Sequence, residues 1–207
     1  MTDSSRTPLV VVSVGTDLHE FDRMIDWMDA WNPQFDVQVI IQRGTSKYSH
    51  AWDSRELIPH AELLDLFRAA TVVISHGGPS TVMDARYCKK FPIVVARNPE
   101  FDEHVDEHQM EFAKHLDRNG VAKVIDSQDE FYAALNEGIA NPSSMTIETS
   151  DGAIAGVVEF ASVVDGLLGT TTPVYAEATQ NDSGSAQGVD SSFGNPELNA
   201  ELNAGEA

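Results

Sequence analysis

The chain has 207 residues, enough for one good hydrophobic core, and its hydrophobic fraction of 42% is ordinary for a globular protein. Its net charge of −20 is unusual, since all 13 Lys and Arg residues lie at or before Lys123 while 14 of the 33 acidic residues follow it. Such a field repels polyanions, so we expect no nucleic-acid partner.

Cysteine usage and hydropathy bear on the compartment. Cys88 is the only cysteine, so no intrachain disulfide can form, as is usual for a protein of the reducing cytoplasm. We expect its side chain to be a small residue of the core. No run approaches 18 consecutive apolar residues, and no basic N-terminal segment precedes an apolar stretch. We therefore expect a cytoplasmic protein that reaches a membrane only through a partner.

Alternating strands and helices are predicted along the first two thirds of the chain. Short valine- and isoleucine-rich runs predict buried strands at residues 9–14, 37–42, 71–75, 92–96 and 121–125, with a short extended piece at 55–58. Helical spacing of apolar residues predicts helices at 21–31, after Pro59, at 79–87, 109–116, 128–139 and 154–168. This order indicates an α/β fold, a Rossmann-like parallel sheet with helices on both faces.

The ends of the chain differ from its centre. We expect a flexible N-terminus at residues 1–8, one domain at 9–169 and a disordered acidic tail at 170–207. The tail is rich in Ser, Thr, Asn, Gly and Glu, and it holds too little apolar surface to offset its ordering entropy.

The most informative segment follows the predicted strand at 71–75. It contains His76-Gly77-Gly78, then Pro79 where a helix could begin, then Ser80 and Thr81. Glycines allow close backbone approach, and the N–H groups of a helix N-terminus attract anions. A phosphate or diphosphate site is the functional interpretation, and a plain strand-to-helix turn is the alternative.

Two familiar nucleotide motifs are missing. The lysine of a GxxxxGK[ST] loop does not occur here, nor does a GxGxxG fingerprint. Mononucleotide hydrolysis and ordinary dinucleotide binding are therefore disfavoured.

Four segments in order resemble the C-terminal domain of glycosyltransferase family 28, over about residues 9–141. They are Val12-Ser13-Val14-Gly15-Thr16, Ile40-Ile41-Gln42-Arg43-Gly44, Ile74-Ser75-His76-Gly77-Gly78-Pro79-Ser80 and Glu103-His104-Val105-Asp106-Glu107-His108-Gln109. The likeness is strongest to the single-domain donor subunits of two-part transferases.

The resemblance implies one half of a GT-B fold that holds a UDP-sugar. Because few residues precede Leu9, it also implies a membrane-anchored subunit that binds the acceptor. The donor would carry a hexose derivative, the acceptor would be polyprenyl-linked, and no cofactor or metal would be needed.

Site roles follow from the resemblance position by position. Gly77, Gly78, Pro79, Ser80 and Thr81 match the loop that faces the donor diphosphate. Asp84 stands where relatives place a glutamate on the ribose hydroxyls, so it is a departure from the pattern.

Two further segments match donor-side motifs. Asp106 and Gln109 match an Asp-x-x-Gln pattern that meets the donor sugar, and Gly15 and Thr16 match a glycine loop lining the interdomain cleft. His76 has three open interpretations, namely donor-site lining, a structural role or a catalytic base.

Two patterns of acidic or histidine residues could indicate a functional site, but each has a simpler structural explanation. His104 and His108 are spaced as on one helical face, but their order lacks the His-Glu-x-x-His arrangement of zinc proteases, so we expect no metal site. Asp22 and Asp26 are interpreted as a solvated helix face.

The predicted function is a UDP-sugar-dependent hexosyltransferase subunit that acts as a heteromer. One alternative is a non-catalytic donor-fold scaffold in a polysaccharide-synthesis complex. A sugar-nucleotide epimerase shares the GT-B architecture but needs both halves in one much longer chain.

Overall fold

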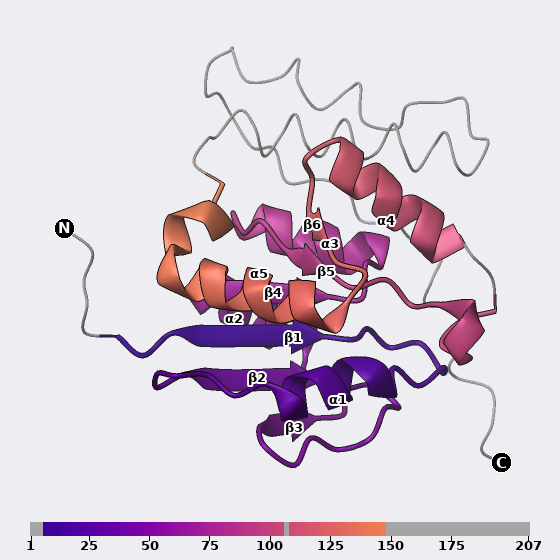
Figure 1. Ribbon diagram of the computed structural model, residues 1–207, viewed down its shortest axis with the longest axis horizontal. Helices are drawn as coiled ribbons and strands as arrows, with labels where there is room; N and C mark the ends of the chain where they lie inside the picture. Colours follow the sequence, from indigo (N-terminus) through magenta and orange to yellow (C-terminus); the bar gives the residue numbers. More distant parts are fainter. Residues whose placement is uncertain (1–5, 106–107, 148–207) are drawn as a thin grey trace, which may run out of the picture.

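A single parallel sheet forms the centre of the computed structural model, which describes residues 6–105 and 108–147. Within those residues the sheet has six strands, β1 (Leu9–Ser13), β2 (Gln38–Gln42), β3 (Asp53–Arg55), β4 (Val72–Ser75), β5 (Ile93–Val94) and β6 (Lys123–Val124). Their spatial order is β3-β2-β1-β4-β5-β6 (Figure 1). The order therefore reverses between β1 and β4, and in open α/β sheets ligands bind at such a point.

The strands are apolar on both sides, as the continuous valine runs predict. In β1, Val10 and Val12 belong to one core cluster, whereas Leu9 and Val11 belong to the cluster on the opposite face. Val12 pairs in register with residues of both neighbouring strands. A strand in the middle of a doubly covered sheet needs apolar side chains in both directions.

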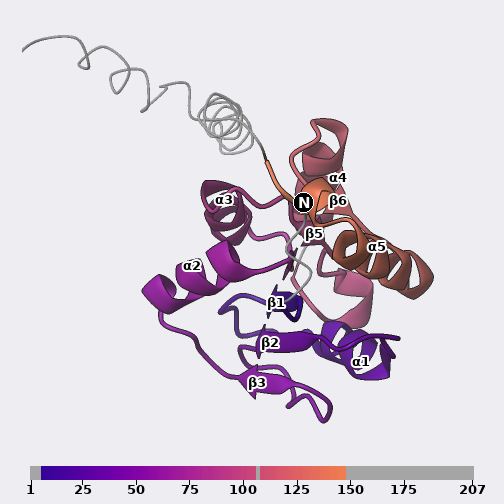
Figure 2. The same ribbon diagram turned by 90° about the vertical axis from the view of Figure 1, so that its left-hand side faces the viewer.

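Helices cover both faces of the sheet. α1 (Asp22–Ala30) and α5 (Gln128–Ala140) pack on one face, and α2 (His60–Ala69) and α3 (Pro79–Tyr87) pack on the other (Figure 2). α4 (His108–Arg118) packs beside β6 and shares a smaller apolar cluster with α3. Two 3₁₀ helices, η1 (Pro99–Phe101) and η2 (Pro142–Met145), complete the described elements. The predicted fold class is confirmed.

The predicted extended piece at 55–58 is wrong in position. β3 ends at Arg55, and Ile58 donates its N–H to Gln42 Oε1 at 3.1 Å instead of to a neighbouring strand. The chain leaves the sheet there because a buried side-chain amide satisfies the Ile58 backbone.

Other local predictions are confirmed. Pro79 occupies the first turn of α3, and Gly120 adopts a left-handed φ of +61° after α4. Cys88 is buried in the core beside α2. The predicted helix at 154–168 and the tail at 170–207 lie outside the described residues, as do residues 1–5.

The Asp26 side chain is 61% exposed, in agreement with the predicted solvated helix face, and the acidic residues of α1 also bind the loop between β2 and β3. Asp22 accepts the Lys47 backbone N–H at 2.8 Å, and Asp26 binds the Lys47 ammonium. One turn later, Asp29 accepts the N–H of His50 at 2.9 Å. The acidic row therefore anchors the loop between β2 and β3.

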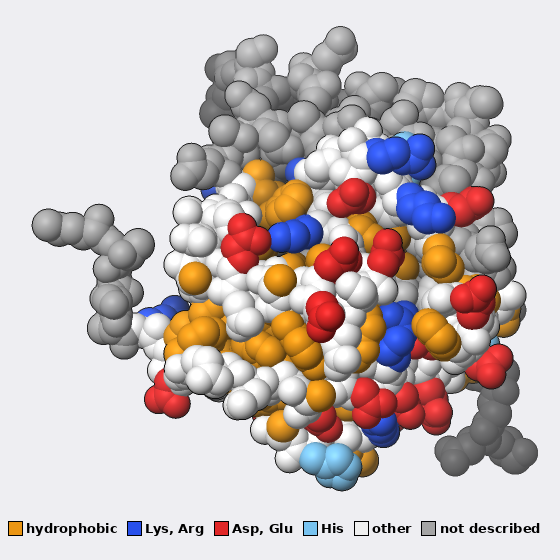
Figure 3. Space-filling view, in the orientation of Figure 1, with side chains coloured by type: hydrophobic (Ala, Val, Ile, Leu, Met, Phe, Trp, Pro, Cys, Tyr) orange, Lys and Arg blue, Asp and Glu red, His pale blue; other side chains and the backbone are white. Residues whose placement is uncertain are grey.

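The face that carries α1 and α5 shows acidic side chains spread among apolar ones (Figure 3). No helix in the described part of the chain is long and apolar enough to cross a membrane.

Candidate functional site

A cleft of about 580 Å³ opens where the strand order reverses, at the carboxyl ends of the central strands. The loop after β1, the segment leading into α2 and the turn from β4 into α3 form its walls. It is lined by Gly15, Thr16, Asp17, Gln42, Leu57, Ile58, Pro59, His60, Leu63, His76, Gly78, Pro79, Ser80, Thr81 and Asp84.

Eight of the site residues predicted from the sequence meet in this cleft. They are Gly15, Thr16, His76, Gly78, Pro79, Ser80, Thr81 and Asp84. Gly77 lies in the same turn, where a Cβ would lie 3.0 Å from Val94 Cγ1, and Gln109 lies at the start of α4 and does not line the cleft. Asp106 lies outside the described residues.

A row of polar residues at the ends of three strands holds the cleft loops. Ser13 ends β1 and pairs in register with both Gln42 and Ser75, the last residues of β2 and β4. Ser13 Oγ accepts the N–H of Gly15 at 3.4 Å, and Ser75 Oγ accepts the N–H of Gly77 at 3.1 Å. Each glycine turn is therefore tied to the strand that it follows.

The imidazole of His76 fills the space between two glycines. A Cβ on Gly15 would lie 2.6 Å from His76 Cε1, and a Cβ on Gly78 would lie 2.3 Å from His76 Nε2. Gly15 also has a φ of +83°, which residues with a side chain rarely adopt. Glycine is required at both positions because the ring leaves no room for a side chain.

His76 is neutral at physiological pH. Burial, assisted by the nearby Arg97 guanidinium, lowers the pKa of His76 from 6.5 to about 4, although the backbone carbonyl of Ser13 opposes the shift. The side chain is only 7% exposed, and Nδ1 lies 3.4 Å from the Ser13 oxygen. This geometry favours a lining and packing role, and the catalytic role stays a prediction.

Two helix N-termini face the cleft without a side-chain cap. α3 begins at Pro79 after Gly78, α2 begins at His60 after Pro59, and neither has a capping side chain. The first N–H groups of a helix have no intrahelical partner and carry partial positive charge. Among the described residues, no Lys or Arg lines the cleft, so the backbone N–H groups at these helix starts are the groups there that could bind an anion.

Asp84 lies on the α3 wall and bonds to a histidine on the α2 wall. His60 Nε2 lies 3.0 Å from Asp84 Oδ2, with 67% of the His60 side chain and 25% of the Asp84 side chain exposed. The sequence indicated Asp84 as a site residue but not His60. The only signal available was the position of His60 directly after the Pro59 helix start.

Sequence reasoning also missed Arg97, which is 1% exposed beneath the cleft loops. Its guanidinium donates to the backbone oxygens of Val14 at 2.9 Å, His19 at 2.6 Å and Glu103 at 3.0 Å. These bonds hold the loop after β1 against the loop after β5. An arginine directly after a buried strand was the one available signal.

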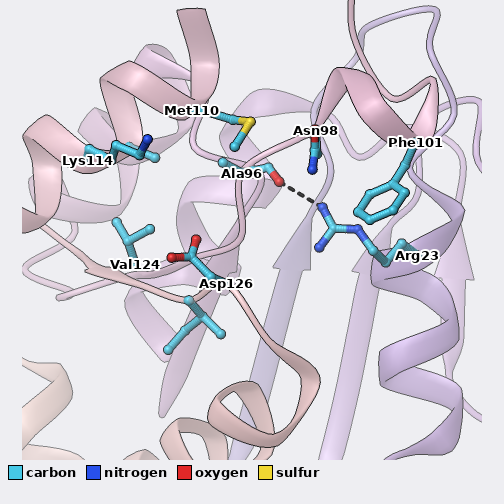
Figure 4. A pocket seen from close by; sticks show the side chains of 10 residues that line it. Arg23, Ala96, Asn98, Phe101, Met110, Lys114, Val124 and Asp126 are labelled. Atoms are coloured by element: carbon cyan, nitrogen blue, oxygen red, sulfur yellow. Dashed lines mark hydrogen bonds between the residues drawn. The ribbon is translucent and has the colours of Figure 1, made fainter. Parts of the chain in front are cut away.

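A second cavity, of about 260 Å³, lies between α4 and the loops after β5 and β6 (Figure 4). Arg23 on its wall donates to Ala96 O at 2.9 Å and forms two bonds with the Glu103 carboxylate, at 2.9 and 2.7 Å. Its guanidinium also lies 5.2 Å from the ring centroid of Phe101. Arg23 is therefore already engaged by the protein.

The histidine pair considered for metal binding does not share a helical face, which corrects that interpretation. His104 precedes α4, which begins at His108, and its ring lies 5.7 Å from the ring of His19. Within residues 6–105 and 108–147, no three His, Cys, Asp or Glu side chains are placed to hold a metal ion.

Solved structures with a similar fold are glycosyltransferases. The glycosyltransferase of kitacinnamycin is 16% identical, with a TM-score of 0.50, over 78% of this chain and 42% of that one. MurG of Acinetobacter baumannii is 16% identical, with a TM-score of 0.49, over 80% of this chain and 51% of that one. This chain thus spans about half the length of the structures it matches, and no curated protein matched. Its fold is one half of the GT-B architecture.

A family model identifies the chain more directly. Residues 9–161 match the model for the glycosyltransferase family 28 C-terminal domain. The chain belongs to this family, and glycosyl transfer is the reaction class that the family supports.

Proposed function

We propose that this chain is the UDP-sugar-binding subunit of a heteromeric hexosyltransferase. It takes a hexose derivative from UDP and acts with a membrane-anchored subunit that binds a polyprenyl-linked acceptor. The chain would then work in the cytoplasm, held at the membrane by its partner. Family membership supports glycosyl transfer, and the cleft at the strand-order reversal supports donor binding.

One observation carries the donor assignment. The uncapped N-terminus of α3 and the glycine turns after β1 and β4 meet in a cleft that, within the described residues, no Lys or Arg side chain lines. A diphosphate gains charge as it leaves the sugar, and fixed backbone N–H groups stabilise that charge without reorganising. The cleft therefore suits a diphosphate leaving group.

The remaining roles follow the family pattern. The diphosphate would lie on the turn at Gly77–Ser80, and Asp84 would contact the ribose. Thr16, after Gly15, would lie near the donor sugar, and Gln109 would reach it from α4. His76 would keep the two glycine turns apart.

The test is calorimetric titration of UDP into the wild type and a Gly78→Asp variant. Gly78 is the N-cap of α3, so the new carboxylate would bond to the N–H groups that the diphosphate needs, and it would collide with His76. We expect micromolar binding by the wild type and none by the variant. Gly120→Asp is the control, because nothing lies within 4 Å of a Cβ there.

Two outcomes would contradict the proposal. Unchanged UDP binding in Gly78→Asp would move the donor site elsewhere. Equal transferase activity in the complex with and without an intact 76–80 turn would favour the non-catalytic scaffold.

A further inference from the structure

A histidine and an aspartate from different helices meet at the rim of the cleft. His60 is the first residue of α2, and Asp84 lies in the second turn of α3. Their 3.0 Å contact joins the two helices across the space that both residues line.

Within the described part of the chain, the Asp84 carboxylate has one oxygen, Oδ1, that is free to bind a ligand. Asp84 is three-quarters buried, and its Oδ2 bonds to His60, while Oδ1 makes no hydrogen bond with the described residues. Nearby carboxylates are engaged differently, since Asp17 Oδ1 accepts the N–H of His19 at 2.8 Å. Asp84 is thus a mostly buried acid on the cleft wall whose partner, His60, is an exposed residue of the same cleft.

We propose that His60 and Asp84 act together as the subsite for the ribose diol of the nucleotide, with His60 as the specificity-determining residue. This inference rests on the proposed UDP-sugar function and adds a residue to it. An aspartate is one methylene shorter than a glutamate, so Asp84 alone reaches less far into the cleft. His60 extends the polar surface from the opposite wall.

The pair offers the groups that a diol requires. With the proton on Nε2, His60 donates to Asp84 and keeps Nδ1 as an acceptor, while Asp84 keeps Oδ1 as an acceptor. Two acceptors match the two hydroxyl donors of a ribose ring. Removal of either hydroxyl costs a hydrogen bond to one of these acceptors, which lowers affinity.

The experiment compares two probes, UDP and 2′,3′-dideoxy-UDP, which share the base and the diphosphate. We expect the wild type to prefer UDP by at least about tenfold. His60→Ala and Asp84→Ala should each reduce this preference to below about threefold and leave the dideoxy affinity unchanged. The double variant should lose no more than either single variant, because the residues act as one unit.

Conservative and control variants separate recognition from packing. His60→Gln keeps an amide donor for Asp84 and a carbonyl acceptor, so we expect an intermediate preference. His50→Ala and Asp65→Asn change exposed residues away from the cleft and should retain the wild-type preference. Circular dichroism of each variant verifies the fold.

The outcomes distinguish this inference from the proposed function. Failure of the wild type to bind either nucleotide would overturn both. Binding of both nucleotides with equal affinity, or a preference that survives His60→Ala, would overturn the ribose subsite alone and leave the nucleotide site standing.

Discussion

Two sets of loops at the same edge of the sheet handle positive charge in opposite ways. The turns after β1 and β4 line the cleft and contribute no Lys or Arg to it. The loop after β5, a short distance along the same edge, contains Arg97 and binds Arg23 of α1. Arg97 is 1% exposed there, and Arg23 forms a two-bond ion pair with the buried Glu103.

The arginines therefore hold the loops in place, whereas the backbone N–H groups of the cleft are the groups proposed to bind the ligand. The guanidinium groups bond to carbonyl oxygens and a carboxylate of the protein, so these side chains hold the loops together and do not themselves line the cleft. The cleft keeps backbone N–H groups of α3 for its ligand. Backbone donors are rigid and cost no side-chain entropy on binding, whereas an arginine would have to be ordered.

Among the variants considered, Arg97→Met should lower the free energy of unfolding most. It leaves the carbonyl oxygens of Val14, His19 and Glu103 without their donor, and it loosens the loop after β1. We expect the free energy of unfolding to fall by about 4 kcal/mol in urea titrations. Arg68→Met, at an exposed pair with Asp65, is the control and should change stability by less than about 0.5 kcal/mol. Equal losses of stability in the two variants would show that the buried arginine does not hold the loops more strongly than an exposed ion pair.

Gly15→Ala tests the cleft side of the comparison. The methyl group would meet His76 at 2.6 Å, on a backbone with a φ of +83°. We expect a loss of about 3 kcal/mol from strain and collision together. Gly120→Ala shares the positive φ but has nothing within 4 Å, so only about 1 kcal/mol should be lost. Matching values would show that the His76 ring does not restrict the turn.

The next largest effect is the loss of stability that we expect when the pH is lowered. His76 has a folded-state pKa of about 4, below its unfolded value near 6.5, so protonation favours the unfolded chain. The contribution of His76 is complete above about pH 7 and declines as the pH falls toward 4. Between pH 7.5 and 5 the loss should be about 2 kcal/mol.

His76→Asn should remove that part of the pH dependence, as measured by unfolding at each pH. His50→Asn, at an exposed position, should retain it. Parallel stability curves for wild type and His76→Asn would show that the buried imidazole is not the titrating group.

Lys47→Met should have the smallest effect. Lys47 binds Asp26 on α1, with 38% and 61% of the two side chains exposed. Solvent screens such a pair, and we expect less than about 0.5 kcal/mol in the same urea titration. A loss above about 2 kcal/mol would show that exposed ion pairs here act like the buried arginines.

Sequence patterns were sufficient for the architecture. Apolar runs located the strands because a doubly covered parallel strand is apolar throughout, and Pro79 and Gly120 marked a helix start and a helix end. The meeting of the two glycine turns follows from the sheet, since adjacent parallel strands end at one edge. The β3 position was missed because the Gln42 side chain, not a strand, satisfies Ile58.

Contacts between distant residues could not be predicted from one sequence. Arg23 and Glu103 are 80 residues apart, and His60 and Asp84 are 24 apart on different helices. Neither pair leaves a periodic pattern, because each depends on how two elements pack. The buried state of Arg97 was likewise hidden, since its charge resembles that of its exposed neighbours in the sequence.

The row formed by Ser13, Gln42 and Ser75 has a consequence for amide hydrogen exchange. The amides of Gly15, Gly77 and Ile58 are bonded to this row and should exchange slowly, although all three lie in loops. The first amides of α3 lack a side-chain cap and should exchange quickly until an anion binds. A deuterium-exchange map of the free protein would therefore distinguish the amides that build the cleft from those reserved for its ligand.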